Sequence, residues 1–443
     1  MGRLIPLMPR FAGAFLFGAV PRTGVDLSQV PPGGRRLSCA AMELDLIIVG
    51  AGPAGLCLAR ALHGSGLRMA LIEQNSLASL QAPAFDGREI ALTQHSTGLL
   101  RQLGLWPLLG EANIAPLKDA LVLDGSVGPA QSRMRISHRL SPRSELGFLV
   151  ANHHIRRAAY EAALGAGEGA APPLICGQQV TGIRTDAESA RITLSDGRTL
   201  SARLVVAADS RHSSTRRAMG IAADMHDYGR TMLVCNMTHA QPHEETAWEW
   251  FDHGQTLALL PMNPDPASGL PRSSVVLTLP HQAIQPLLDM DEAGFNHEMA
   301  QRFGHQLGEM HLVSTRHAYP LVGVWARRFV AQRFAVVGDA AVGMHPVTAH
   351  GFNLGLRSIA TLSQALIQAH QGGQDIASPQ LLERYHQTHQ RAARGLFMAT
   401  HAVATLYTRE HVPARWLRRG MVELGERFTP FKRAVAASLT GLA

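Results

Sequence analysis

The sequence predicts an α/β fold: a Rossmann-like nucleotide-binding domain with an inserted antiparallel β-sheet domain and a C-terminal helical region. Three observations support this prediction. A glycine-rich turn, residues 50–55, lies between an apolar strand pattern and a helical pattern. A second glycine-rich segment, residues 338–355, follows another apolar run much later in the chain. Short runs rich in β-branched and aromatic residues separate the two, as is typical of antiparallel sheets.

The first glycine-rich turn has the surroundings of a dinucleotide-binding βαβ unit. A strand pattern precedes it, a helical pattern follows it, and a second strand, residues 69–72, ends in Glu73. Gly50 permits the tight turn, Gly52 lets the backbone approach a pyrophosphate, and Gly55 lets the helix pack closely on the strand. Glu73 occupies the position at which an acidic side chain accepts the ribose hydroxyls. The whole unit therefore predicts a bound dinucleotide.

Composition and charge restrict the class of protein. A chain of 443 residues with 46% hydrophobic content can bury more than one compact core, so we expect two closely joined domains. The 41 basic and 34 acidic residues give a net charge of +7, but the arginines form no basic run, so nucleic-acid binding is not indicated. The four cysteines have neither a CxxC pair nor metal-ligand spacing. They predict reduced thiols in a cytosolic-type compartment and no bound metal.

The chain changes character at several boundaries. Residues 1–41 contain five arginines and a single acid, and Met42 directly precedes the first expected strand. We favour a disordered upstream extension without a folded role, and a targeting segment is the alternative. The other expected boundaries are 42–220 for the first part of the nucleotide-binding domain, 221–330 for the substrate-binding sheet domain, 331–375 for the second part of the nucleotide-binding domain and 376–443 for the C-terminal helical region.

Local patterns assign further elements. Residues 152–164 have a helical pattern, and the apolar run 204–208 delivers Asp209 at the carboxyl end of a strand, where open α/β sheets bind ligands. Helices are also expected over 292–307 and from Leu381 onward. No window approaches twenty uninterrupted apolar residues, so no helix is expected to span a membrane.

These motifs occur in the order seen in the group A FAD monooxygenases, which the chain resembles from about residue 42 to its C-terminus. Within that group it is similar to the ubiquinone-biosynthesis hydroxylases of the UbiH/UbiF/VisC type. The motifs that carry this narrower resemblance are Asp86-Gly87-Arg88-Glu89-Ile90-Ala91-Leu92, Tyr319-Pro320-Leu321, His345-Pro346 and Gly351-Phe352-Asn353-Leu354-Gly355-Leu356. The resemblance implies a GR2/PHBH-type FAD-binding domain in an FAD-dependent monooxygenase.

FAD is the cofactor that the resemblance implies, and NAD(P)H, for which no second dinucleotide motif exists, would bind transiently as reductant. Arg88 would reach the flavin phosphates and Asp339 the ribityl chain or ribose. The helix that begins near Asn353 would direct its positive end at the flavin pyrimidine edge. The expected cofactor-binding residues are Gly50, Gly52, Pro53, Ala54, Gly55, Glu73, Arg88, Val180, Asp209, Gly338, Asp339, Gly351 and Asn353.

The implied reaction inserts one atom of O2 into the aromatic ring of a polyprenylated phenol or quinol intermediate of ubiquinone biosynthesis, through a flavin C4a-hydroperoxide. Ring carbon C5 of a demethoxyubiquinol-type substrate is the position considered. The catalytic candidates are His345, Pro346 and His350, with turn hydrogen bonding as the alternative role of the histidines. The sheet that bears Trp248, Trp250, Leu257, Leu259 and Leu260 is the expected apolar wall for the polyprenyl tail, and the sequence does not show which of its side chains face the tail.

A cytoplasmic protein is expected. The arginine-containing C-terminal helices are compatible with peripheral contact with the inner membrane, and the alternative is that their polar faces simply pack or stay solvated. The resemblance adds other ubiquinone-biosynthesis proteins as candidate partners. Three departures are similar to the UbiM-type branch: Ser210 stands where the family usually has glycine, Val342 where it has histidine, and His350 where it has glutamine. Two alternatives remain. One is a non-catalytic FAD-binding accessory protein of the quinone-synthesis complex, and the other is a flavin-dependent halogenase, suggested by Trp248-Glu249-Trp250.

Overall fold

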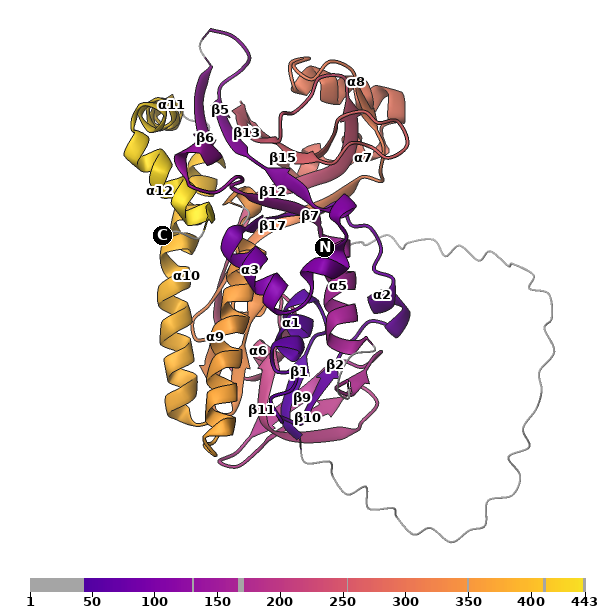
Figure 1. The fold of residues 1–443 in the computed structure, drawn as a ribbon, viewed down its shortest axis with the longest axis vertical. Helices are drawn as coiled ribbons and strands as arrows, with labels where there is room; N and C mark the ends of the chain where they lie inside the picture. Colours follow the sequence, from indigo (N-terminus) through magenta and orange to yellow (C-terminus); the bar gives the residue numbers. More distant parts are fainter. Residues whose placement is uncertain are drawn as a thin grey trace, which may run out of the picture. The chain divides into compact units, whose positions relative to one another are not determined.

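The computed structural model describes residues 44–129, 131–165, 171–252, 254–348, 350–408 and 412–440. The expected extension 1–41 lies outside these ranges. The chain divides into two units after Met42, and the second unit contains all the described elements. In this unit the α/β fold with an inserted antiparallel sheet and C-terminal helices is confirmed (Figure 1).

A mostly parallel sheet forms the nucleotide-binding part. Its order is β18 (Val330–Ala331), β19 (Phe334–Val336), β11 (Thr199–Ala207), β1 (Leu44–Val49), β2 (Met69–Ile72) and β8 (Leu174–Ile175), with β10 (Ala190–Leu194) and β9 (Val180–Thr185) added beside β11. Strands β1, β2, β11 and β19 pair in parallel. Every residue of β1 is buried, as expected of a central strand with both faces covered. The parallel pairing brings the carboxyl ends of β1, β11 and β19 to one edge.

A second, larger sheet contains the inserted strands. Its order is β20 (Val342–Gly343), β17 (His317–Ala326), β12 (Ala223–His239), β15 (Arg272–Pro280), β14 (Gln255–Met262), β13 (Thr246–Asp252), β5 (Asp119–Asp124) and β6 (Ser132–Ser137), with β16 (Met310–Leu312) paired to β12. The pairs are antiparallel except β13 with β5, which is parallel. Strands β5 and β6 come from the range 42–220, so this sheet draws on both sides of the expected boundary at 220.

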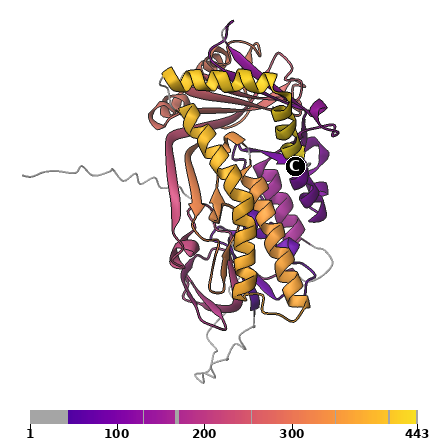
Figure 2. The ribbon, with the colours of Figure 1, turned by 90° about the vertical axis from the view of Figure 1, so that its left-hand side faces the viewer.

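A small sheet joins β3 (Glu89–Thr93), β7 (Gly147–Ala151) and β4 (Ala115–Leu117), and helices cover the three sheets. The helices are α1 (Pro53–Ala61), α2 (Leu77–Gln81), α3 (Gln94–Gln102), α4 (Trp106–Leu109), α5 (Asn152–Leu164), α6 (Ser214–Ala218), α7 (Gln285–Asp289), α8 (Glu292–Arg302), α9 (Gly351–Gln371), α10 (Pro379–Thr408), α11 (Val412–Arg427) and α12 (Thr429–Thr440). Helices α9 and α10 contact each other along the nucleotide-binding part (Figure 1). Helix α11 lies over β5 and β6 (Figure 2).

The two faces of the large sheet are covered differently. Leu233, Cys235 and Met237 of β12 form a core with side chains of α8, such as Phe295 and Met299. Part of the opposite face, on β5 and β6, packs against α11 and α12. The alternation of side chains along each strand therefore decides which residues reach the α8 core and which face away from it.

Helix α8 is shorter than expected, since it ends at Arg302 instead of continuing to residue 307. Gly304 and His305 follow with φ angles of +59° and +55°, a left-handed conformation that ends an α-helix. At its start, the Asp291 carboxylate accepts a hydrogen bond from the Gly294 N–H at 2.8 Å and caps the helix. Within the described ranges, no helix combines the length and the apolar character needed to cross a bilayer.

Candidate functional site

The first glycine-rich turn has the geometry of a phosphate-binding loop. Gly50 has a φ of +101°, and a Cβ there would lie 2.6 Å from the carbonyl oxygen of Ala208, the residue after β11. A Cβ on Gly55 would lie 1.9 Å from the Gly50 carbonyl oxygen, so only glycine allows α1 to pack this closely. A Cβ on Gly52 would have no neighbour within 4 Å. Gly52 thus borders open space at the N-terminus of α1, where backbone N–H groups favour an anion.

Glu73 connects β2 to this turn. Its Oε2 accepts a hydrogen bond from the Ala51 N–H at 2.7 Å, and its Oε1 accepts one from the Asn75 N–H at 2.8 Å. The side chain is buried. The segment that leads to Val180 lies beside Glu73, because the Gln178 N–H donates to the Glu73 carbonyl oxygen at 3.0 Å. The structure therefore places Glu73 and the segment leading to Val180 next to the glycine turn.

The second glycine-rich segment meets the first at the edge formed by β1, β11 and β19. Gly338 follows β19 with a φ of +59°, and a Cβ there would lie 2.9 Å from the Ala54 Cβ in the first turn of α1. A Cβ on Gly355 of α9 would lie 3.4 Å from the Gly338 Cα. The Gly338 N–H donates to the Ser358 hydroxyl at 3.2 Å. Two segments far apart in the sequence thus form one site.

Asp339 lies beside this contact and pairs with an arginine that the sequence analysis did not single out. The Arg211 Nη2 is 3.1 Å from the Asp339 Oδ2, and the Arg211 Nη1 donates to the Val322 carbonyl oxygen at 3.2 Å. Buried Arg216 donates to the Ala340 carbonyl oxygen at 2.9 Å. Both arginines follow the predicted strand end at Asp209, and that proximity is the sequence signal that could have identified them.

Asp209 organises the turn after β11. Its Oδ1 accepts the Ser213 hydroxyl at 2.5 Å, and its Oδ2 accepts the Thr215 N–H at 3.1 Å and hydroxyl at 2.7 Å. Ser210 has a φ of +76°, in the left-handed region that favours glycine. The glycine expected from the resemblance would adopt this conformation without strain, and this chain adopts it with serine.

Arg88 lies in a polar cluster between the nucleotide-binding part and the large sheet. Its Nη2 is 2.6 Å from the Asp86 Oδ2, and its guanidinium lies 5.3 Å from the centre of the Tyr319 ring. The Tyr319 hydroxyl donates to the Asp86 carbonyl oxygen at 2.8 Å. Burial raises the pKa of Asp86, but Arg88 and the hydrogen bond from Asn152 outweigh it and hold that pKa below its usual value. The Tyr319 motif thus holds the Arg88 turn against the sheet.

The start of α9 is tied to β3. The Asn353 Nδ2 donates to the Ala91 carbonyl oxygen at 2.8 Å, and the Asn353 Oδ1 accepts from the Thr93 N–H at 3.1 Å. Gly351 is the first residue of the helix, which runs to Gln371. The positive end of a long helix is therefore held at β3, close to the Arg88 turn.

The three catalytic candidates precede α9. His345 is buried, and burial, with Arg211 and His401 nearby, lowers its pKa to about 4. Its Nδ1 accepts a hydrogen bond from the Val347 N–H at 3.1 Å, as in the turn role considered for it. Pro346 is exposed and begins a short 3₁₀ helix, and half-buried His350 directly precedes α9. Their catalytic roles stay predictions.

One face of the sheet expected to form the apolar wall is covered by α8. Trp248, Trp250, Leu257 and Leu259 pack into the core on that face, and the Trp250 Nε1 donates to the Gly125 carbonyl oxygen at 2.8 Å. Leu260 alternates with Leu259 and therefore lies on the other face, so the sheet as a wall for the polyprenyl tail stays a prediction. The alternation of side chains along β13 and β14 indicates two faces, but the sequence could not show which face α8 covers.

Glu249 lies between the two tryptophans in sequence and therefore on the opposite face of β13. By accessible surface it is only partly buried, yet the surrounding protein raises its pKa to about 8.

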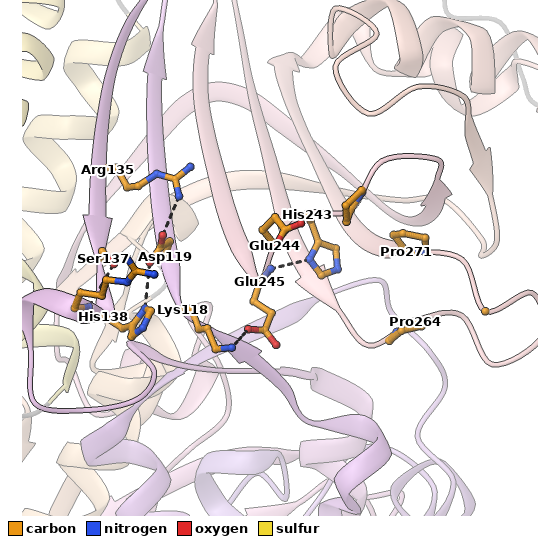
Figure 3. A pocket seen from close by; sticks show the side chains of 13 residues that line it. Lys118, Asp119, Arg135, Ser137, His138, His243, Glu244, Glu245, Pro264 and Pro271 are labelled. Atoms are coloured by element: carbon orange, nitrogen blue, oxygen red, sulfur yellow. Dashed lines mark hydrogen bonds and ion pairs between the residues drawn. The ribbon is translucent and has the colours of Figure 1, made fainter.

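A separate surface pocket lies where β5 and β13 begin (Figure 3). Four of the charged side chains that line it form two ion pairs, Lys118 with Glu245, and Arg135 with Asp119 at 2.9 Å. The His138 ring hydrogen-bonds the same Asp119 carboxylate at 3.3 Å. None of the expected site residues lines this pocket. Among the described side chains, no group of three or more His, Cys, Asp or Glu is arranged to hold a metal ion.

Comparisons with known proteins show the family to which the chain belongs. A family model described as FAD binding domain matches residues 43–400. The ubiquinone hydroxylase UbiM of Neisseria meningitidis is 42% identical over 402 residues, which cover 90% of this chain and 85% of that protein. The ubiquinone hydroxylase UbiL of Rhodospirillum rubrum is 35% identical, with 88% of this chain and 87% of that protein covered.

Solved structures share the fold. PqsL of Pseudomonas aeruginosa, in complex with 2-aminobenzoylacetate, superposes with a TM-score of 0.71 at 21% identity and covers 85% of this chain and 99% of its own. The p-nitrophenol 4-monooxygenase PnpA of Pseudomonas putida also has a TM-score of 0.71, at 18% identity, and covers 90% of this chain and 98% of its own.

The fold and the converging glycine motifs define an FAD-dependent monooxygenase, as predicted. The open side of Gly52, the N-terminus of α1 and the partly exposed Asp339 fit FAD as its cofactor. The chain belongs to the FAD-binding family and, within it, to the ubiquinone-biosynthesis hydroxylases of the UbiH/UbiF/VisC type that include UbiM.

Proposed function

We propose that this monooxygenase hydroxylates the aromatic ring of a polyprenylated phenol or quinol in ubiquinone biosynthesis. The observation that carries the proposal is the 42% identity to a ubiquinone hydroxylase over 90% of the chain. The 3-demethoxyubiquinol 3-hydroxylase of Escherichia coli is a more distant relative, 26% identical over 77% of this chain. Ring carbon C5 of a demethoxyubiquinol-type substrate is the position that we propose.

In this proposal FAD, reduced by transiently bound NAD(P)H, supplies the oxygen chemistry. The protein binds and orients the reactants. Gly52 and the N-terminus of α1 hold the pyrophosphate, Glu73 the adenosine ribose, and Asp339 with Arg211 the chain between the phosphates and the ring system. Arg88 adds a cation near the phosphates.

The N-terminus of α9 stabilises negative charge on the reduced cofactor, since a helix presents partial positive charge at that end. His345 stays neutral near pH 7, because burial lowers its pKa to about 4. It therefore adds no positive charge beside Arg211. The proposed roles of Pro346 and His350 are to shape the turn that leads into α9 and to border the reacting ring.

Complementation tests this function directly. Strains blocked at each ring hydroxylation of ubiquinone synthesis receive this chain, and mass spectrometry identifies the quinone intermediates. Restoration of one step assigns the ring position. Purified FAD-bound protein that consumes neither NAD(P)H nor O2 with any prenylated phenol or quinol would refute the hydroxylase function and support the accessory role.

We also propose that α11 and α12 contact an anionic membrane surface, from which a polyprenylated substrate would be taken. Four apolar side chains around the junction of α11 and α12 are exposed: Met421, Leu424, Phe428 and Phe431. Leu424 is the most exposed, at 68%. Exposed Arg427 lies in the same stretch, and a basic, amphipathic surface of this kind binds anionic lipids.

Co-sedimentation with vesicles tests the membrane contact. The protein should bind vesicles that contain phosphatidylglycerol, and Leu424→Glu together with Phe428→Glu should abolish binding. Leu270→Glu, at an exposed apolar position away from these helices, is the matched control. Equal sedimentation of the double variant and the parent would refute the membrane contact. The competing role to examine would then be binding of a ubiquinone-biosynthesis protein by the same exposed side chains.

A further inference from the structure

The face of the large sheet that points away from α8 carries buried polar side chains without partners. Leu233 and Cys235 of β12 reach the α8 core, so Asn236 lies on the other face. Ser274 of β15 lies directly opposite Asn236 in the strand register. Asn236 is 6% exposed and Ser274 is 0% exposed. The Asn236 Oδ1 and the Ser274 Oγ have no hydrogen-bond partner.

Buried polar atoms of folded proteins are nearly always hydrogen-bonded, so two unpartnered oxygens on facing residues need an explanation. The main chain at Asn236 is satisfied, because its N–H donates to the Ser314 hydroxyl at 2.8 Å. Directly opposed residues have Cβ atoms about 4.5–5.5 Å apart, so the Asn236 and Ser274 side chains form one polar patch.

A third group reaches the same stretch of the sheet. Glu89, the first residue of β3, has a buried Oε1 without a hydrogen-bond partner. Arg272 interacts electrostatically with the Glu89 carboxyl group and precedes Ser274 by two residues, on the same side of β15. Burial, which outweighs this arginine, raises the pKa of Glu89 to about 8. The carboxyl group therefore remains largely protonated near pH 7 and can donate a hydrogen bond.

The position of β3 relates this patch to the flavin-binding residues. The turn before Glu89 rests on the sheet, since a Cβ on Gly87 would lie 2.7 Å from the Val234 Cγ2. Val234 is two residues before Asn236, on the same face of β12. The other end of β3 is held by Asn353 at the start of α9. Glu89 thus begins the strand that runs from the face of the sheet carrying the polar patch to the start of α9.

We propose that Glu89, Asn236 and Ser274 form a binding site for the hydroxyl or carbonyl oxygens on the aromatic ring of the substrate. This inference rests on the proposed function. The three side chains offer a carboxyl group, an amide oxygen and a hydroxyl, which together can donate to and accept from ring oxygens. A ring without such oxygens leaves these groups unpaired, so the site selects oxygenated rings over their hydrocarbon analogues.

Ligand binding to the FAD-loaded protein tests this site without turnover. The probes are geranyl hydroquinone and geranylbenzene, which lacks the ring oxygens, and the change in flavin absorbance reports binding in the absence of reductant and O2. Ser274→Ala and Glu89→Met should each raise the Kd of geranyl hydroquinone about tenfold, as expected for one lost hydrogen bond. The Kd of geranylbenzene should not change. The Tm of Ser274→Ala should equal or exceed that of the parent, because an unpartnered hydroxyl is removed.

Ser273→Ala is the matched control. Ser273 is also 0% exposed, but its hydroxyl bonds the His239 Nε2 at 2.8 Å on the α8 side of the strand. This variant should lower the Tm and leave the Kd of both probes unchanged. If the parent binds geranyl hydroquinone and Ser274→Ala and Glu89→Met bind it equally well, the ring-oxygen site is refuted. If the FAD-loaded parent binds neither probe, the proposed function itself fails.

Discussion

Replacing Glu249 by glutamine should stabilise the protein, and increasingly so as the pH rises. Glu249 lies on β13, facing away from the α8 core, and burial raises the pKa of its carboxyl group from 4.5 to about 8. The folded protein therefore holds this proton more tightly than the unfolded chain does. As the pH rises above 4.5, the unfolded chain releases the proton first, and folding becomes less favourable. Glutamine has almost the same shape and no proton to release.

The size of this effect follows from the pKa difference. Between pH 4.5 and about 8, each pH unit should add about 1.4 kcal/mol to the stability advantage of Glu249→Gln. From pH 5.5 to pH 8 the advantage should grow by up to about 3 kcal/mol. This is an upper bound, since part of the side chain surface is accessible.

Urea unfolding of the parent and the variant, at several pH values and a fixed excess of FAD, measures the difference. The midpoints should coincide near pH 4.5 to 5 and separate progressively up to pH 8. Glu188→Gln makes the same chemical change at an exposed turn and controls for it. A constant difference between Glu249→Gln and the parent across this range would refute the reasoning, as would a variant that becomes less stable at pH 8.

Three further substitutions have expected outcomes. Gly338→Ala should cost about 2–3 kcal/mol of stability and weaken FAD binding, because it combines a φ of +59° with a close contact to α1. Gly373→Ala, with a φ of +65° and no neighbour within 4 Å, should cost only about 1 kcal/mol. Equal costs of the two variants in urea unfolding would show that the contact to α1 adds nothing. Ser210→Gly should stabilise the protein by about 0.5–1 kcal/mol, because it relieves a φ of +76°; a lower thermal midpoint would contradict this. Arg418→Met should lower the free energy of unfolding by about 3–5 kcal/mol, because it removes a buried partner of Asp124 at 3.2 Å and an ion pair that holds α11 on β5. A loss of stability below about 1 kcal/mol would show that the pair is dispensable.

Local sequence patterns were sufficient for the nucleotide-binding turn and the elements around it. The predicted helix 152–164 has the bounds of α5, and the first glycine turn lies between β1 and α1 as expected. These features depend on near neighbours in the chain: a glycine for a positive φ, a period of 3.6 for a helix and an apolar run for a central strand. The resemblance then extended the prediction to FAD and to the monooxygenase class.

Contacts between distant segments were beyond a single sequence. The ion pair between Arg211 and Asp339 joins residues 128 positions apart, and no local pattern links them. The side chains of the predicted wall that face the tail could not be chosen from the sequence, because alternation along a strand shows that two faces exist and cannot show which one α8 covers.

The sequence by itself determined that a dinucleotide turn, a second glycine segment and an antiparallel insertion share one chain, since each is encoded by residues within a few positions of one another. Only the tertiary structure decided what these parts do to one another. It brought Gly338 against Ala54 and placed Ser273 and Ser274, adjacent and chemically identical, on opposite faces of β15. The physical reason is that strand pairing and helix packing join residues far apart in the sequence, and burial by those neighbours sets each side chain's partners and charge.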